Sequence, residues 1–317
     1  MKFYTNDPIS IIACMASLDK KISEVVYVIP DPNNRGLGIT NNYLEVLNSR
    51  YSASQKIASN LNLKISKISW SYFQDNISEV QIVDSLLAQG KIPNTHTVIM
   101  QSSDTYCVLG FSTYRSFLRT KIKLRSYWRK RLRYNKFNTF YFFGKLNNEV
   151  NSKKLLNIDI KKAKDLLELV SSDFIKTIIE KYNIDLESRY LLVLPPSVEN
   201  CGIDFVEKFF RQVNYLANDK NLKILIKPHR NDNIHKLFEV SKLKDVIDYN
   251  SVKQLFSEFF FLIPNIERII SVPSSSLTFA DYSKLTVFVP KDRKLFRKKF
   301  LDQTCYLDSI GVNYSKI

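Results

Sequence analysis

A histidine follows a predicted strand at a point where it could act on a phosphate. The apolar run 224–226 ends in Lys227, Pro228 and His229, and the chain has only three histidines. Because proline fixes φ and lacks a backbone N–H, it ends the strand ladder, and the next side chain leaves the sheet at its edge. An imidazole there can protonate or hydrogen-bond a phosphate leaving group, with Lys227 and Pro228 beside it as nucleotide-binding residues. A loop histidine bonded to the backbone is the alternative.

Three consecutive serines follow a second predicted strand. Segment 268–281 is interpreted as a strand, Pro273, the hydroxyls of Ser274, Ser275 and Ser276, and then a helix. Hydroxyls at a helix N-terminus, together with its free N–H groups, bind an anion without a metal. An ordinary helix cap is the alternative. Because the serines and the Lys-Pro-His motif each follow a strand of the same predicted sheet, we favour a phosphate site.

Strands and helices alternate along the chain, which predicts an α/β protein with parallel sheets covered on both faces. Before residue 150 we expect strands at 24–30, 63–70, 96–101 and 139–144, and helices at 41–61 and 78–90. After residue 187 we expect strands at 189–196, 222–229, 246–250, 268–274 and 286–290, and helices at 203–219, 231–243, 251–265 and 275–284.

Two such alternating stretches predict two domains. They correspond to a GT-B-like architecture, in which two doubly wound Rossmann-like domains face a central cleft and ligands bind at the carboxyl ends of both sheets. We expect an N-terminal acceptor-side domain at 1–150, a helical connection without strands at 151–187, and a C-terminal nucleotide-binding domain at 188–317. A chain of 317 residues is long enough for two domains of about 150 residues each.

The positive charge of the chain is concentrated in one segment. The net charge is +16, and segment 111–136 holds ten Lys or Arg residues, no acid and several aromatic side chains. Three interpretations are open, namely a nucleic-acid patch, an amphipathic surface on anionic lipid, and a solvated face. No nucleic-acid-binding module accompanies the segment, so we favour the anionic inner membrane surface over nucleic acid.

Other features favour a cytoplasmic protein at the periphery of the inner membrane. No apolar run approaches the roughly 18 residues that a transmembrane helix needs, and the N-terminus is interpreted as a strand and a helix rather than a signal peptide. The four cysteines lie far apart without a CxxC pair, which indicates reduced thiols and no zinc site.

The Pro-His pair and the serine run together resemble the HP and serine motifs of bacterial sialyltransferases, namely the lipooligosaccharide sialyltransferases and the capsular polysialyltransferases. The stretch KFYTNDPISIIACMASL is similar to the first strand, turn and apolar helix of that family, and GFSTYRSF, RLRYNK and FYFFG follow in the family's order. The resemblance implies that His229 is the acid or phosphate partner of CMP and that Ser274, Ser275 and Ser276 bind its phosphate.

The same resemblance implies a reaction. It is an inverting, metal-independent transfer of a nine-carbon acidic sugar, such as sialic, pseudaminic or legionaminic acid, from its CMP conjugate. The acceptor would be a hydroxyl of a glycan or lipid-linked glycan of the bacterial surface, in capsule or lipooligosaccharide. No cofactor and no metal are expected, because hydroxyls, N–H groups and an imidazole can stabilise the phosphate charge.

The chain departs from this family where a general base is expected. The family has two acids before a glycine, whereas this chain has Cys-Val-Leu-Gly at 107–110. A base that deprotonates the acceptor hydroxyl must then come from elsewhere. Glu199, in a turn after a predicted strand, is the first candidate, and Asp104, Asp204 and Asp31 are alternatives. An ordinary turn residue is the other interpretation of Glu199.

Two other functions fit the same residues. A Kdo transferase would use the same phosphate chemistry, since Kdo is also activated as a CMP conjugate. A non-catalytic protein that binds a polyanion or nucleic acid would account for the positive charge and for the missing acid pair.

Overall fold

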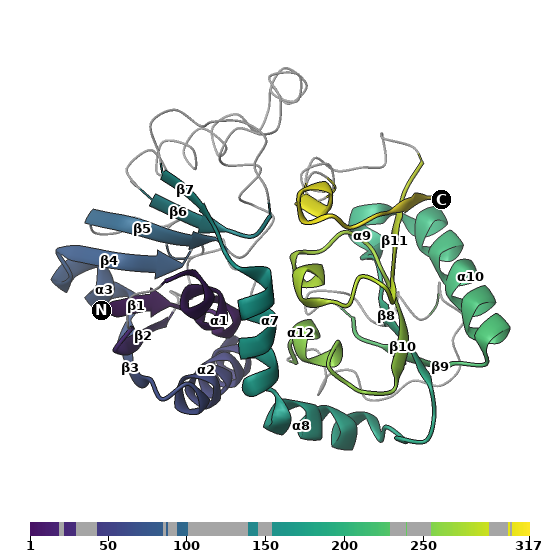
Figure 1. Cartoon of the computed structure of the whole chain (residues 1–317), viewed down its shortest axis with the longest axis horizontal. Helices are drawn as coiled ribbons and strands as arrows, with labels where there is room; N and C mark the ends of the chain where they lie inside the picture. Colours follow the sequence, from purple (N-terminus) through teal and green to yellow (C-terminus); the bar gives the residue numbers. More distant parts are fainter. Residues whose placement is uncertain are drawn as a thin grey trace. The chain divides into compact units, whose positions relative to one another are not determined.

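Every strand pair that the structure describes is parallel. The computed structural model describes residues 1–18, 22–29, 43–84, 87, 94–100, 139–144, 154–228, 239, 255–291, 304 and 306–317. The chain divides into two units, Met1–Val170 and Ser171–Ile317, and each is described by itself (Figure 1). The protein is an α/β protein with parallel sheets, as the alternating pattern predicted.

The first unit is built on a parallel sheet whose strand order reverses next to its first strand. Its described strands are arranged in the order β3-β2-β1-β4-β5-β6-β7. In chain order they are β1 (Lys2–Thr5), β2 (Glu24–Ile29), β3 (Lys64–Ser69), β4 (Glu79–Asp84), β5 (Asn94–Met100), β6 (Thr139–Phe142) and β7 (Lys154–Asn157). The chain moves outward from β1 to β3 on one side and from β4 to β7 on the other. Parallel sheets bind ligands at the carboxyl edge beside such a reversal.

Helices cover this sheet. Those that the structure describes are α1 (Pro8–Ser17), α2 (Tyr43–Asn60), α3 (Trp70–Asn76) and α7 (Ile160–Leu169). Helix α1 begins directly after β1 with Pro8 in its first turn. The N–H groups of the first turn have no partner within a helix, so the N–H that proline lacks costs no hydrogen bond. Because α1 contacts both α2 and α7, it is buried along almost its whole length.

The helix expected at 78–90 is wrong, because residues Glu79–Asp84 form β4. Val80 and Ile82 are buried, whereas Glu79 and Gln81 are exposed, which is the period-two alternation of a strand with one covered face. Apolar residues further along the segment also fit helical spacing. Pairing with both β1 and β5 decides between the two patterns.

The other elements expected before residue 150 are confirmed. The strands at 24–30, 63–70, 96–101 and 139–144 correspond to β2, β3, β5 and β6, and the helix at 41–61 corresponds to α2. Segment 151–187 contains α7 and α8 (Ser172–Tyr182), but it also contains β7, although no strand was expected there. Strand β7 is only four residues long, too short for a recognisable period, and it forms by pairing with β6.

A buried carboxylate ties together the two strands at the reversal. Asp84, the last residue of β4, has no exposed surface. Its Oδ2 accepts hydrogen bonds from the Thr5 hydroxyl and the Asn6 N–H (2.9 Å), and its Oδ1 accepts one from the Leu87 N–H (2.8 Å). Burial raises the pKa of Asp84 from 3.8 to about 6, although these hydrogen bonds favour the ionised form. The carboxyl ends of β1 and β4 are thereby held at the same level.

In the second unit, β8 lies between two neighbouring strands. The described strands are arranged in the order β12-β11-β10-β8-β9. In chain order they are β8 (Tyr190–Leu194), β9 (Lys223–Ile226), β10 (Ile266–Ser271), β11 (Leu285–Val289) and β12 (Ser315–Lys316). The described helical segments besides α8 are α9 (Val198–Cys201), α10 (Ile203–Lys220), α12 (Ser257–Phe260) and the 3-10 helix η3 (Ser275–Phe279).

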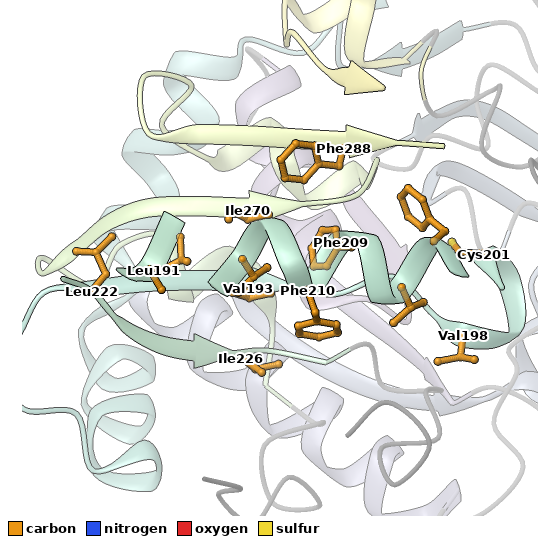
Figure 2. Packing of buried hydrophobic residues seen from close by; sticks show 14 residues of the cluster. Leu191, Val193, Val198, Cys201, Phe209, Phe210, Leu222, Ile226, Ile270 and Phe288 are labelled. Carbon is orange, nitrogen blue, oxygen red and sulfur yellow. The ribbon is translucent and has the colours of Figure 1, made fainter. Parts of the chain in front are cut away.

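Helix α10 packs its apolar face on this sheet. The buried residues of that face recur at helical spacing; they are Phe205, Val206, Phe209, Phe210, Val213 and Ala217. Figure 2 shows the helix beside Val193 of β8 and Ile270 of β10. The rings of Phe209 and Phe288 meet edge to face, with their centroids 6.1 Å apart. This packing fixes α10, and with it the short α9 that connects α10 to the end of β8.

Most of the elements expected in this unit are confirmed. The strands at 189–196, 222–229, 268–274 and 286–290 correspond to β8, β9, β10 and β11, and the helix at 203–219 corresponds to α10. The helix expected at 251–265 is confirmed only in part: of its described residues, 255–265, only Ser257–Phe260 form a helix, α12, and turns follow it. The elements expected at 231–243 and 246–250 lie outside the described residues, apart from Glu239.

The helix expected at 275–284 is wrong in type and length. Residues Ser275–Phe279 form η3, a 3-10 helix that ends where Ala280 takes an extended conformation. The Asp281 side chain then accepts a hydrogen bond from the Ser283 N–H (3.0 Å), which forms a turn instead of a further helical turn. The phosphate site expected at these serines therefore lacks the dipole of a full α-helix.

None of the helices that the structure describes combines the length and the apolar character needed to cross a bilayer. The basic segment 111–136 lies outside the described residues. Its attachment to an anionic membrane surface stays a prediction.

The raised pKa of Asp84 predicts an unusual pH dependence of stability. Between pH 3.8 and about 6 the folded state keeps a proton that the unfolded state has lost, so this residue's contribution to stability falls as pH rises. The difference of roughly two pKa units corresponds to about 3 kcal/mol. We expect the free energy of unfolding of Asp84→Asn minus that of the wild type, both measured in urea, to rise by about this amount from pH 4 to pH 7.

Glu24 provides a matched control. Hydrogen bonds from Ser66 and Lys2 lower the pKa of Glu24, so its contribution to stability is lost as pH falls, which is the opposite sign. Glu24→Gln should therefore lose ground to the wild type as pH rises from about 3 to 7. A difference between Asp84→Asn and the wild type that does not change with pH would contradict the first expectation.

Candidate functional site

The residues expected to bind a nucleotide lie at the carboxyl edge of the second sheet. The chain leaves β8 through α9 and α10 to reach β9 on one side, whereas β10 and β11 lie on the other side. Leu194 of β8 pairs with Ser271 of β10, and Val193 pairs with Ile226 of β9. The carboxyl ends of β8, β9 and β10 therefore differ by no more than one residue in register. The loops that follow them begin side by side at a reversal of strand order, where parallel sheets bind ligands.

The serine run forms a tight turn at this edge. Ser274 precedes η3 and its hydroxyl accepts a hydrogen bond from the Ser276 N–H (3.4 Å). The hydroxyls of Ser274 and Ser276 are 3.0 Å apart and hydrogen-bond to each other, and Ser276 is buried. Within the part of the chain that the structure describes, the hydroxyl of half-buried Ser275 has no such partner. Ser275 is therefore the member of the run whose hydroxyl is available to a ligand.

A buried hydroxyl chain holds this turn in place. The Thr278 hydroxyl donates to the carbonyl of Ser275 (2.8 Å) and is hydrogen-bonded to the Tyr306 hydroxyl. Since a threonine has a single hydroxyl proton, Tyr306 must be the donor of the second bond. Both side chains are buried. The Tyr282 hydroxyl donates to the Thr278 carbonyl (3.3 Å), and burial raises the pKa of Tyr282 to about 12, so it stays protonated.

Lys227 brings a positive charge to the same edge. It follows β9 directly, its N–H donates to the carbonyl of Val193 (2.9 Å), and only 6% of the residue is exposed. Its ammonium Nζ donates to the carbonyl of Pro228 (2.7 Å). The Tyr182 hydroxyl of α8 donates to the carbonyl of Ile226, the last residue of β9 (3.3 Å). The ammonium is therefore held at the strand end, where a cation suits an anionic ligand.

The structure describes the proposed catalytic residues only in part. Glu199 lies in α9, directly after the carboxyl end of β8, and its side chain is outside what is described. Asp204 is exposed in the first turn of α10. His229, Asp104 and Asp31 lie outside the described residues. The acid role of His229 and the base role of Glu199 stay predictions.

No group of three or more His, Cys, Asp or Glu side chains that could hold a metal occurs among the described residues. The expectation that the reaction needs no metal stays a prediction. Sequence reasoning missed Thr278 and Tyr306, which position the serine turn. No local signal identifies them, since their hydrogen bond joins residues 28 positions apart.

Comparison with known proteins gives little. No protein-family model matches the chain, and no curated protein does. Among solved structures, the chain is similar to an alpha/beta-galactoside alpha-2,3-sialyltransferase from the luminous marine bacterium Photobacterium phosphoreum. The two are 10% identical, the match covers 98% of this chain and 95% of that one, and the TM-score is 0.47. A similarity at this level assigns neither a fold family nor a function to the chain.

The hydroxyl chain beneath the serine turn predicts a coupled loss of stability. Thr278→Val removes one hydrogen bond to the Tyr306 hydroxyl and one to the Ser275 carbonyl, so we expect the free energy of unfolding to fall by about 1–2 kcal/mol. Tyr306→Phe should lower it by about 1 kcal/mol. The double variant should lose less than the sum, because the two changes remove one shared interaction. Urea unfolding of the four proteins gives this double-mutant cycle; strictly additive losses would show that the two hydroxyls do not interact.

Proposed function

We propose that the protein is a glycosyltransferase that uses a CMP-activated, sialic-acid-like nonulosonate as its donor. The observation that carries the proposal is the alignment of two strand ends: the Lys227-Pro228 pair and the Ser274–Ser276 turn flank β8 at one carboxyl edge. These are the segments whose sequence resembles the HP and serine motifs of bacterial sialyltransferases. A cation and a free hydroxyl at a reversal of strand order suit the phosphate of a nucleotide.

The chemistry assigned to these residues is an inverting displacement. The acceptor hydroxyl attacks the anomeric carbon of the sugar, the bond from that carbon to the phosphate oxygen breaks, and its electron pair leaves with CMP. Negative charge then builds on the phosphate, where Lys227, the Ser275 hydroxyl and His229 would stabilise it. His229 would protonate the phosphate or hydrogen-bond to it, and Glu199 would take the proton of the acceptor hydroxyl. No metal is needed in this scheme.

The finer assignment covers the whole chain. In a GT-B-like arrangement the second unit would bind the donor and the first would bind the acceptor, a hydroxyl of capsule or lipooligosaccharide. Sialic, pseudaminic and legionaminic acid are all donors of the required kind. Segment 111–136 would hold the enzyme on the cytoplasmic face of the inner membrane, close to lipid-linked glycans. This arrangement rests on the sequence pattern and on the parallel sheets.

The nucleotide assignment predicts selective stabilisation by CMP. A ligand that binds only the folded state at a hundred times its Kd adds about 2.7 kcal/mol to the free energy of unfolding. We therefore expect CMP, but not UMP or GMP, to raise the melting temperature in thermal unfolding. A protein that only binds polyanions would show no such selectivity and would instead bind DNA or RNA with a steep dependence on salt.

Two serine variants provide the control for the CMP experiment. Ser275→Ala removes a hydroxyl that has no partner among the described residues, so it should leave the stability of the free protein unchanged and weaken CMP binding about tenfold. Ser276→Ala removes a buried hydroxyl that is bonded to Ser274, so it should lower stability even without ligand. CMP binding that is unaffected by Ser275→Ala would exclude this turn from the phosphate site.

The catalytic assignment predicts which residues affect turnover. His229→Ala should lower kcat by about a hundredfold or more without changing the melting temperature, as expected for loss of an acid catalyst. Glu199→Gln should lower kcat comparably, because it removes the base. The measurement is release of CMP from a panel of CMP-nonulosonates and CMP-Kdo with a glycan or lipid-linked acceptor.

Asp104→Asn is the matched comparison, since it replaces the carboxylate of the alternative base by an amide, as Glu199→Gln does. If Asp104→Asn lowers kcat and Glu199→Gln does not, the base is Asp104. If CMP-Kdo is the only donor that turns over, the protein is a Kdo transferase. Turnover by His229→Ala at the wild-type rate would remove that residue from the mechanism.

A further inference from the structure

The first unit has its own reversal of strand order, and buried polar residues gather there. The turn Thr5-Asn6-Asp7 joins β1 to α1 at the carboxyl edge beside β4. The Asp7 N–H donates to the Thr5 hydroxyl oxygen (2.9 Å), and the Asn6 N–H donates to Asp84 (2.9 Å). The three residues of the turn are at most 5% exposed. This is the position in a parallel sheet where a ligand is expected.

Two buried polar groups near this turn have no hydrogen-bond partner among the described residues. Within the part of the chain that the structure describes, Oδ1 of Asn6 accepts no bond and Nη1 of Arg50 donates none. Asn6 is 2% exposed and Arg50, in the middle of α2, is 7% exposed. A buried acceptor or donor without a partner destabilises a fold by about 1–3 kcal/mol, more where the group is charged. Asp84, by contrast, is satisfied by three donors of the protein itself.

Arg50 and Asp7 interact through space without touching. Helices α1 and α2 pack together, and the positive charge of Arg50 acts on the Asp7 carboxyl, whose pKa is raised by burial and partly lowered again by that charge. Among the described residues, no direct ion pair joins the two. The Arg50 guanidinium and the Asp7 carboxyl are therefore buried groups that act on each other at a distance.

The unpartnered atoms limit the kind of ligand. Asn6 Oδ1 needs a donor, and Arg50 Nη1 needs an acceptor. A phosphate or a carboxylate offers acceptors only and would be repelled by Asp7. A hydroxyl donates and accepts, so a pair of neighbouring hydroxyls can satisfy the amide oxygen and the guanidinium together, beside an Asp7 carboxylate that already accepts a hydrogen bond from the Ser10 hydroxyl (3.4 Å). Because Asp7 balances the charge of Arg50, a neutral ligand fits better than an anion.

We propose that Asn6, Asp7 and Arg50 form a second binding site, at the carboxyl edge of β1, for neighbouring hydroxyls of a neutral sugar. As an acceptor-glycan site this rests on the proposed glycosyltransferase function, but binding of a sugar can be measured without the nucleotide. Asp7 holds a sugar hydroxyl by accepting its proton in a hydrogen bond. Asn6 and Arg50 fix the sugar's orientation.

Binding of neutral disaccharides to the full chain tests the site. Saturation-transfer NMR with lactose, maltose and chitobiose, recorded without nucleotide, should show that at least one of them binds. Asn6→Leu has nearly the same volume and removes the unpartnered oxygen, so it should weaken binding at least tenfold without lowering the melting temperature. Arg50→Met should weaken binding similarly, whereas Arg50→Lys keeps the charge and should retain more of it.

Ser54→Ala is the matched control. Ser54 is also buried and its hydroxyl also lacks a partner among the described residues, but it lies one turn further along α2, away from the carboxyl edge. This variant should bind the disaccharide as the wild type does. If Arg50→Met does not fold, Asn6→Leu and Arg50→Lys still decide the outcome.

The proposal and the nucleotide assignment can fail separately. If none of the three disaccharides binds the wild type, or if one binds wild type, Asn6→Leu and Arg50→Met equally, the sugar site is wrong and the buried groups are satisfied by ordered water alone. The rise in melting temperature with CMP should be the same in all these variants. Disaccharide binding without any effect of CMP would leave this site standing and remove the nucleotide site.

Discussion

Both candidate sites depend on parallel strand pairing. In a parallel sheet the carboxyl ends of all strands lie at the same edge. The loops that follow the strands therefore bring residues far apart in the chain to one edge. In the second unit β8 has a partner on each side, and all five of its residues are buried, as expected for an inner strand covered on both faces. The pairing of Leu194 with Ser271 sets the level at which the serine turn begins.

The sequence predicted the parts of this architecture that local pattern controls. Strands β8 and β10 are short β-branched and leucine-rich runs ended by proline-containing loops, and the apolar face of α10 recurs at unambiguous helical spacing. Where two periods fit one segment, prediction failed. Residues Glu79–Ile82 alternate as a strand requires, yet the apolar residues that follow also fit helical spacing, and only pairing with β1 and β5 resolves the choice.

The candidate site could be predicted to the same extent. The Lys-Pro-His and serine motifs are continuous in the chain and are visible in the sequence alone. What positions them is not continuous. The hydrogen bond between Thr278 and Tyr306 spans 28 positions, and the one between Thr5 and Asp84 spans 79. The spacing of the two residues in each pair gives no sign of a contact in the sequence. Each pair forms because the chain returns to the same part of its sheet. The length of η3 could not be predicted either, since a serine cap can precede a 3-10 helix as well as an α-helix.

The buried polar groups of the two units differ in one respect that bears on function. The networks around Asp84 and Thr278 are closed, because each oxygen meets a donor or acceptor of the protein, and such networks stabilise a fold. The groups beside Asp7 are not closed, since Asn6 Oδ1 and Arg50 Nη1 find no partner in the described residues. A leucine at position 6 would avoid this free-energy cost. Keeping an amide and a guanidinium there, next to a reversal of strand order, makes sense if a ligand supplies the missing partner. By the same reasoning the Ser275 hydroxyl, which has no partner among the described residues, is the part of the serine turn that meets a phosphate.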